Sequence, residues 1–119
     1  MLETIENLST KDPNDGIIFI KKGKRLKKVI IKEIIYIEVE NRYCNFVTEN
    51  EKFLIQISLN KLLPFLESKN FIRTHRNFIA NLDKIKEITL SENLIIMQGD
   101  YHITLSDKYK SFLSDYLIF

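Results

Sequence analysis

The chain has 119 residues, of which 45% are hydrophobic and 29% charged, so it has room for one domain and is too apolar to be disordered throughout. Its net charge of +2 is too small to indicate a nucleic-acid partner by itself, and the distribution of charge is more informative. The only cysteine, Cys44, excludes an internal disulfide, and one cysteine with two distant histidines does not make a zinc site.

The N-terminus does not have the features of a targeting segment. Residues 1–6 carry acids where a signal peptide has basic residues, and no apolar segment follows. No run approaches the roughly 20 apolar residues of a membrane-spanning helix. We therefore expect a cytoplasmic protein without a membrane contact. Residues 1–16 end in turn-forming residues and are expected to be a tail or linker, and residues 17–119 to form the domain.

Two short apolar segments, residues 17–22 and 25–31, are predicted to be strands joined by the turn Lys22-Gly23-Lys24. Both carry many cations. One interpretation is a solvated edge that resists pairing with other sheets, and the other is a phosphate-binding surface. The cluster comprises Lys21, Lys22, Lys24, Arg25, Lys27 and Lys28.

The next strand, residues 34–40, is predicted to be buried on much of both faces. Its alternation places Ile34, Tyr36 and Glu38 on one face and Ile35, Ile37 and Val39 on the other. Further strands are predicted at residues 43–48 and 52–57.

Asn41 and Arg42 lie between the strands at residues 34–40 and 43–48, where a simple hairpin turn is one interpretation because Asn tolerates turn geometry. Cys44 is expected to pack as a small hydrophobic residue.

An amphipathic helix is predicted after Ser58, which is a suitable N-cap. The leucines at 59, 62, 63 and 66 follow helical spacing and are expected to face the core. Pro64 lies inside this segment and should kink or split the helix, because it lacks a backbone donor.

Residues 71–82 concentrate two arginines, a histidine and two asparagines between apolar residues. The apolar residues, Phe71, Ile72, Phe78, Ile79 and Leu82, are expected to anchor the segment, and Arg73, His75, Arg76 and Asn77 to be held outward. The segment has no Gly or Pro, so it is not predicted to be a flexible loop. Such a cluster suits contact with phosphates and base edges, although a surface connector with solvated charges is the alternative.

Strands are then predicted at residues 85–90, 94–98 and 101–105, with His102 on an outer face. A C-terminal amphipathic helix is predicted after the N-cap candidate Ser106. Its apolar stripe would consist of Tyr109, Phe112, Leu113, Tyr116 and Leu117.

The sequence Phe-Ile-Arg-Thr-His-Arg-Asn-Phe-Ile-Ala-Asn-Leu-Asp-Lys-Ile at residues 71–85 closely resembles the hallmark of the LytTR DNA-binding domain family. Residues 34–38 also match the strand that precedes a DNA-contacting loop in that family, and the resemblance extends from about Ile17 to the C-terminus. It implies a mainly β fold: an elongated, all-antiparallel core of short sheets, with one short internal helix and a C-terminal helix. It also implies a response-regulator-like bacterial transcription regulator that binds direct repeats as a homodimer.

The resemblance implies that loops of the β scaffold contact DNA. His75 is interpreted either as a phosphate donor or as a partly buried residue that orders its segment. The family sequence Ser-Arg-Arg-Tyr is here Ser106-Asp107-Lys108-Tyr109, so an acid replaces a frequent base-reading arginine and would repel phosphate. The candidate DNA-binding residues are Asn41, Arg42, Tyr43, Arg73, His75, Arg76, Asn77, Lys108 and Lys110.

The leading hypothesis is therefore sequence-specific binding of double-stranded DNA for transcription control. The alternative is a protein-interaction module with the same fold that has lost specific DNA binding. We expect no enzyme activity, cofactor or metal, because no phosphate-binding loop, paired carboxylates or nucleophile motif is present in the sequence. A receiver domain commonly precedes such domains and is absent from this chain, so control by a partner kinase would require another segment.

Overall fold

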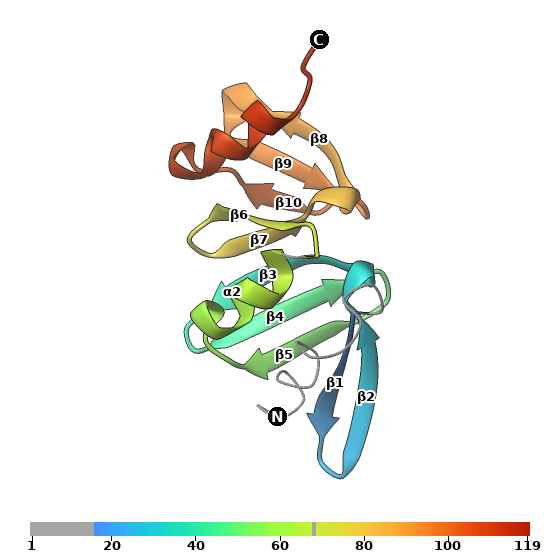
Figure 1. The fold of residues 1–119 in the computed structure, drawn as a ribbon. Coiled ribbons are helices and arrows are strands. Elements are labelled where there is room, and N and C mark those ends of the chain that lie inside the picture. Colours follow the sequence, from blue (N-terminus) through green and yellow to red (C-terminus); the bar gives the residue numbers. More distant parts are fainter. Residues whose placement is uncertain (1–15, 68) are drawn as a thin grey trace.

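A computed structural model describes residues 16–67 and 69–119 (Figure 1). The fold is mainly β and all antiparallel, which confirms the predicted class, and it consists of sheets of two, five and three strands. The strands are β1 (Ile17–Lys22), β2 (Arg25–Ile30), β3 (Ile34–Glu40), β4 (Tyr43–Thr48), β5 (Lys52–Gln56), β6 (Phe71–His75), β7 (Phe78–Asn81), β8 (Ile85–Thr89), β9 (Leu94–Met97) and β10 (His102–Thr104). Within the described ranges, the α-helix is α2 (Leu59–Glu67), and the 3₁₀ helices are η1 (Ile31–Glu33), η2 (Leu82–Lys84), η3 (Leu90–Glu92) and η4 (Asp107–Asp115).

The five-stranded sheet, in the order β5-β4-β3-β7-β6, is the central layer of an elongated molecule (Figure 1). One apolar cluster joins this sheet to α2 and to the root of the β1–β2 ribbon, and its members include Ile37, Phe46 and Leu66. A second cluster joins the sheet to the three-stranded sheet β10-β9-β8 through residues such as Val47 and Ile95. The central sheet is thus covered on both sides, which explains the continuous burial of β3.

The alternation predicted for β3 is wrong at its first residues. The register of β3 against β4 shifts between Ile34 and Tyr36, which marks a β-bulge. As a result Ile34 joins the same cluster as Ile37, whereas Ile35 and Tyr36 both belong to the second cluster. The bulge lets β3 supply two consecutive residues, Ile35 and Tyr36, to the second cluster.

Both helical predictions need correction in detail. Helix α2 runs unbroken from Leu59 to Glu67, so the predicted split at Pro64 is wrong. The carbonyl that loses its partner is that of Asn60, and this residue is exposed, so water can bond to it. The carbonyl of Ser58 accepts from the amides of Lys61 and Leu62 at 3.1 and 3.2 Å, which places the start of the helix where the sequence predicted.

The C-terminal helix is the 3₁₀ helix η4, with non-helical angles at Tyr109 and no fully buried residue. Three residues per turn align Tyr109 with Phe112, and Phe112 packs against the second apolar cluster. Tyr116 and Leu117 lie beyond the helix and are 52% and 86% exposed, so their predicted place in an apolar stripe is wrong. Ser106 makes no side-chain cap, although its carbonyl accepts from the amide of Tyr109.

The expectation that residues 1–16 form a tail or linker falls almost entirely outside the described residues. Gly16 is described, is buried, and accepts a 2.7 Å hydrogen bond from the amide of Ile31. Cys44 is fully buried, as predicted, and His102 is exposed on β10. In the described part of the chain, no helix has both the length and the apolar character needed to cross a membrane.

Candidate nucleic-acid interface

Three connections meet at one edge of the central sheet: the turn between β3 and β4, the turn between β6 and β7, and the start of η4 (Figure 1). Two backbone hydrogen bonds of 2.8 Å hold them together. The amide of Val39 donates to the carbonyl of Asn77, and the amide of Ser106 donates to the carbonyl of Thr74. Residues about 40 and 30 positions apart are therefore fixed beside one another by the backbone itself.

The first connection is a two-residue hairpin turn, because Glu40 pairs with Tyr43. Asn41 has φ 58°, a left-handed conformation that Asn tolerates better than most residues. Arg42 is exposed at the tip, and Tyr43 is 40% exposed. The hairpin interpretation is thus confirmed, and the turn holds the exposed Arg42 at its tip.

Arg73 stabilises the second connection through hydrogen bonds to its backbone. Its Nη2 donates to the carbonyl of Arg76 at 2.8 Å, its Nε donates to the carbonyl of His75 at 3.4 Å, and its guanidinium lies 5.5 Å from the centre of the Tyr109 ring. This one side chain ties the β6–β7 turn to η4. Arg76, by contrast, is exposed and has no side-chain partner within residues 16–67 and 69–119.

His75 orders the same turn. Its Nδ1 accepts from the amide of Asn77 at 3.0 Å, and its half-buried ring lies 5.8 Å from that of Phe78. Because Nδ1 is an acceptor, the proton of the neutral imidazole lies on Nε2, which remains a donor. An ordering role and a donor role are therefore compatible in one residue.

The first two connections and the start of α2 surround an open groove of about 820 Å³. Four of the lining residues are cations from three segments that are distant in sequence: Arg42, Lys61, Arg73 and Arg76. Among the described residues, no carboxylate lines the groove. The remaining lining residues are Val39, Asn41, Gln56, Ile57, Ser58, Leu59 and Asn60.

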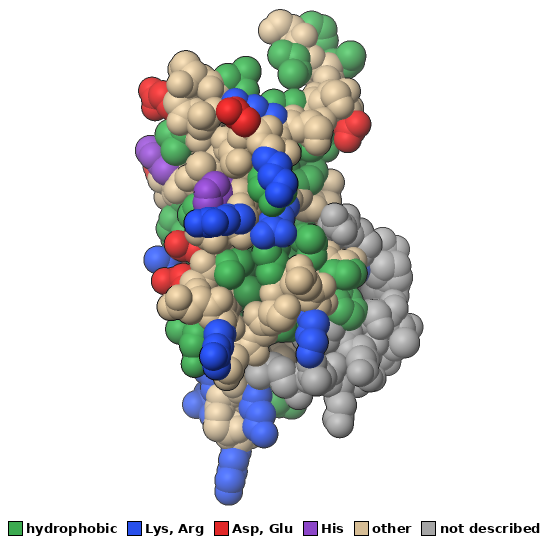
Figure 2. Space-filling view, turned by 90° about the vertical axis from the view of Figure 1, so that its left-hand side faces the viewer, with side chains coloured by type: hydrophobic (Ala, Val, Ile, Leu, Met, Phe, Trp, Pro, Cys, Tyr) green, Lys and Arg blue, Asp and Glu red, His purple; other side chains and the backbone are tan. Residues whose placement is uncertain are grey.

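Figure 2 views this edge, and Lys and Arg side chains recur along its length from the upper part of the molecule to the ribbon. Val39 lines the groove, whereas its neighbours Glu38 and Glu40 point to the other face of β3 because side chains alternate along a strand. Burial, together with the charge of Glu40, raises the pKa of Glu38, and Lys52 partly opposes this. The nearest acids of β3 are thus kept out of the groove.

The third connection is less cationic than its sequence suggests. Lys110 bonds to a carboxylate oxygen of Asp107 and to the side-chain oxygen of Asn93, each at 2.7 Å. Lys108 lies 5.6 Å from the centre of the Tyr109 ring and is exposed. Asp107 therefore neutralises the charge of Lys110. Of these two lysines, only Lys108 remains available for contact with an anion.

The structure places all nine candidate residues on the three connections but brings only four of them into the groove: Asn41, Arg42, Arg73 and Arg76. Tyr43, His75, Asn77, Lys108 and Lys110 lie outside its lining. Sequence analysis missed Asn60 and Lys61. Acidic residues are favoured in the first turn of a helix, but the first turn of α2 contains none. This lack of acids was the sequence feature that could have pointed to Asn60 and Lys61.

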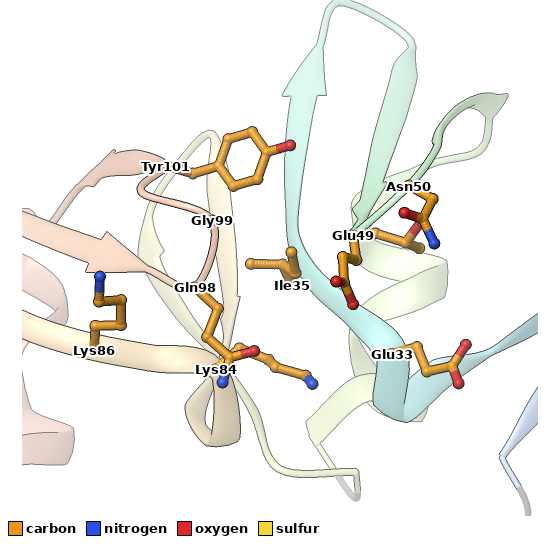
Figure 3. A pocket seen from close by; sticks show the side chains of 10 residues that line it. Glu33, Ile35, Glu49, Asn50, Lys84, Lys86, Gln98, Gly99 and Tyr101 are labelled. Carbon is orange, nitrogen blue, oxygen red and sulfur yellow. The ribbon is translucent and has the colours of Figure 1, made fainter.

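A second hollow, of about 760 Å³, lies at the opposite edge of the sheet (Figure 3). Glu33 and Glu49 face Lys84 across it, and Lys86 stands farther along the same wall. These charges compensate one another, so this hollow does not favour a polyanion.

Comparison with known proteins gives a consistent result. The model of the LytTr DNA-binding domain matches residues 24–118. The sensory transduction protein LytT of Enterococcus faecalis is 32% identical over 83 residues, which is 70% of this chain and 34% of that protein. The transcriptional regulatory protein NatR of Bacillus subtilis is 32% identical over 80 residues, which is 67% of this chain and 34% of that protein. A LytTr DNA-binding domain from Bacillus cereus has the same fold, with a TM-score of 0.72 and 23% identity over 84% of this chain and 94% of that one. The chain spans about a third of the length of these curated relatives.

Proposed function

The chain belongs to the LytTr DNA-binding domain family, and we propose that it binds double-stranded DNA sequence-specifically through the edge that carries the groove. The observation that supports this best is the groove itself: in the described part of the chain, four cations from three separate elements surround it and no carboxylate does. A polyanion whose charges recur every ~1.7 Å along its axis suits such a surface.

In this proposal the connections have different tasks. Arg42 and Arg76 are exposed and have no side-chain partner among the described residues, so they can pair bidentately with guanine or contact phosphates. Arg73 is occupied by two carbonyls and positions the turn that presents Arg76. Asn77, Tyr43 and the Nε2 of His75 would add polar contacts, and Lys61 and Lys108 sequence-independent attraction.

We further propose that the domain serves a bacterial transcription regulator in the cytoplasm and lacks enzyme activity. Relatives named as transcriptional regulatory proteins support this role, and because the chain spans only a third of them, an upstream receiver domain and a partner kinase are part of the proposal. Binding as a homodimer to direct repeats is proposed from the family resemblance.

The test is selection from a random-sequence duplex pool, followed by titration of the enriched duplex and a scrambled one at two salt concentrations. Each bidentate arginine–guanine pair discriminates by about 1–3 kcal/mol, so Arg76→Gln should lose roughly 5- to 150-fold of the preference for the enriched duplex. Lys32→Gln removes the same charge from η1, away from the groove, and should keep the preference. The absence of any enriched sequence would contradict sequence-specific binding.

One observation favours a second function, that of a protein-interaction module. Asp107 stands where the family has a basic residue, and it neutralises Lys110. Asp107→Arg separates the two functions: a DNA-binding domain should gain affinity for duplex, whereas an interaction module should show no duplex binding before or after the change.

A further inference from the structure

The β1–β2 ribbon projects from the end of the molecule opposite the three-stranded sheet (Figure 1). Its register pairs Ile18 with Val29, Ile20 with Lys27, and Lys22 with Arg25, so these side chains share one face. Ile18, Ile20 and Val29 are buried in the first apolar cluster. This face is therefore the inner one, and it anchors the ribbon to the body.

Two cations of the inner face are used within the fold. The Nζ of Lys22 lies 5.0 Å from the centre of the Phe53 ring, and the Nζ of Lys27 lies 3.2 Å from a carboxylate oxygen of Glu51. Both partners belong to β5 or to the turn before it. These contacts fix the direction in which the ribbon extends.

The outer face and the tip are different. Lys21, Lys24 and Lys28 are exposed, and none has a partner in the described ranges 16–67 and 69–119. Cross-strand pairing sets Lys28 beside Phe19 and Lys21 beside Leu26, which are 42% and 63% exposed. A two-stranded sheet consists of two edge strands, so edge protection also accounts for Lys21 and Lys28, whereas Lys24 lies in the turn between the strands.

The ribbon lies below the groove in the view onto the groove edge (Figure 2), and it starts at the side of the body away from the three connections (Figure 1). In the view onto the groove edge, its Lys and Arg side chains continue the series of cations toward the lower end of the molecule (Figure 2). The longest extent of the molecule is 47 Å, which equals about 14 base pairs of duplex at 3.4 Å each. Because the ribbon is set back from the groove edge (Figure 1), a duplex held at the groove has to bend toward the ribbon to reach both. The family model begins at residue 24, so β1 lies outside the range that it matches.

We propose that the outer cations of the ribbon, Lys21, Lys24 and Lys28, contact backbone phosphates of the DNA that flanks the site held at the groove. This inference rests on the proposed function. The ribbon adds affinity without sequence preference and lengthens the footprint on one side only.

The experiment compares two triple variants of equal charge. The ribbon variant carries Lys21→Gln, Lys24→Gln and Lys28→Gln, and the control carries Lys32→Gln, Lys84→Gln and Lys86→Gln, away from the groove edge. Affinity for the enriched duplex is measured from 50 to 300 mM salt, with the flanks intact and with each flank removed. Circular dichroism verifies that each variant is folded.

Each phosphate contact contributes about 0.9 to the slope of log affinity against log salt, so the ribbon variant should lose roughly 2–3 units of slope and the control less than one. Removal of one particular flank should weaken the wild type and the control but leave the ribbon variant unchanged. Equal slopes for the two variants, with the wild type still binding its enriched duplex, would overturn the ribbon contact alone. A wild type that binds no duplex at any salt would overturn the proposed function and the ribbon contact together.

Discussion

Asn81 offers the most direct test of how the interface is supported. It is 1% exposed, and its side chain makes three hydrogen bonds. Its Nδ2 donates to the carbonyls of Ile34 at 2.9 Å and Lys32 at 3.1 Å, and its Oδ1 accepts from the amide of Asp83 at 3.0 Å. One amide thus joins the end of β7 to the start of β3, the strand that leads into the first of the three connections.

Asn81→Ala removes all three bonds and leaves buried backbone groups without partners. At about 1 kcal/mol for each bond, the free energy of unfolding should fall by about 3 kcal/mol, a large part of the ~5–15 kcal/mol that stabilises a typical domain. Urea denaturation measures this loss, and with a slope near 2 kcal/mol per molar the midpoint should fall by about 1.5 M. Asn50→Ala, in the exposed turn before β5, is the control and should change stability by less than about 0.5 kcal/mol.

Asn81→Asp tests whether the two hydrogen bonds donated by the Asn81 side chain cause this stabilisation. The substitution keeps the acceptor for Asp83 but turns a charged oxygen toward the carbonyls of Ile34 and Lys32, so the pKa of the new carboxyl should be raised. A raised pKa in the folded state makes the variant least stable at neutral pH, and it should recover as pH falls and the protonated acid becomes a donor. If Asn81→Asp is as stable as the wild type at pH 7, the two donated hydrogen bonds do not have the role assigned to them.

The remaining predictions concern one half-buried and one fully buried group of the central sheet, Glu38 and Cys44. Because burial raises the pKa of Glu38, its charged form costs stability at neutral pH, and this cost vanishes as pH falls below the unfolded pKa of about 4.3. Glu38→Gln should therefore raise the midpoint of thermal unfolding at pH 7 but not at pH 4, and exposed Glu87→Gln should change neither; a lower midpoint at pH 7 would contradict this. Burial raises the pKa of the Cys44 thiol to about 11, and its Sγ donates to the carbonyl of Ile57 at 3.4 Å. Iodoacetamide at pH 8 should modify Cys44 rapidly in urea and only at the rate of unfolding in buffer, and fast modification of the folded protein would show that the site is open.

The family, the fold class and most strand positions were predictable because they depend on local features. Turn residues such as Asn41 and Gly99 separate short apolar segments, and the hallmark around Arg76 is continuous in sequence. These features can be read from the sequence, because a strand is recognised from its own periodicity and from the turns that flank it.

The tertiary structure decided which side chains are free. Arg73 and Arg76 look equivalent in the sequence, but hydrogen bonds to two carbonyls occupy only Arg73. Lys110 is neutralised by Asp107, and Lys61 enters the groove from a helix that the sequence assigned to the core. Such differences arise from strand register, from the bulge in β3 and from hydrogen bonds between residues tens of positions apart. None of these leaves a local pattern, so the sequence by itself determined the scaffold, and the long-range pairing determined the surface that the scaffold presents.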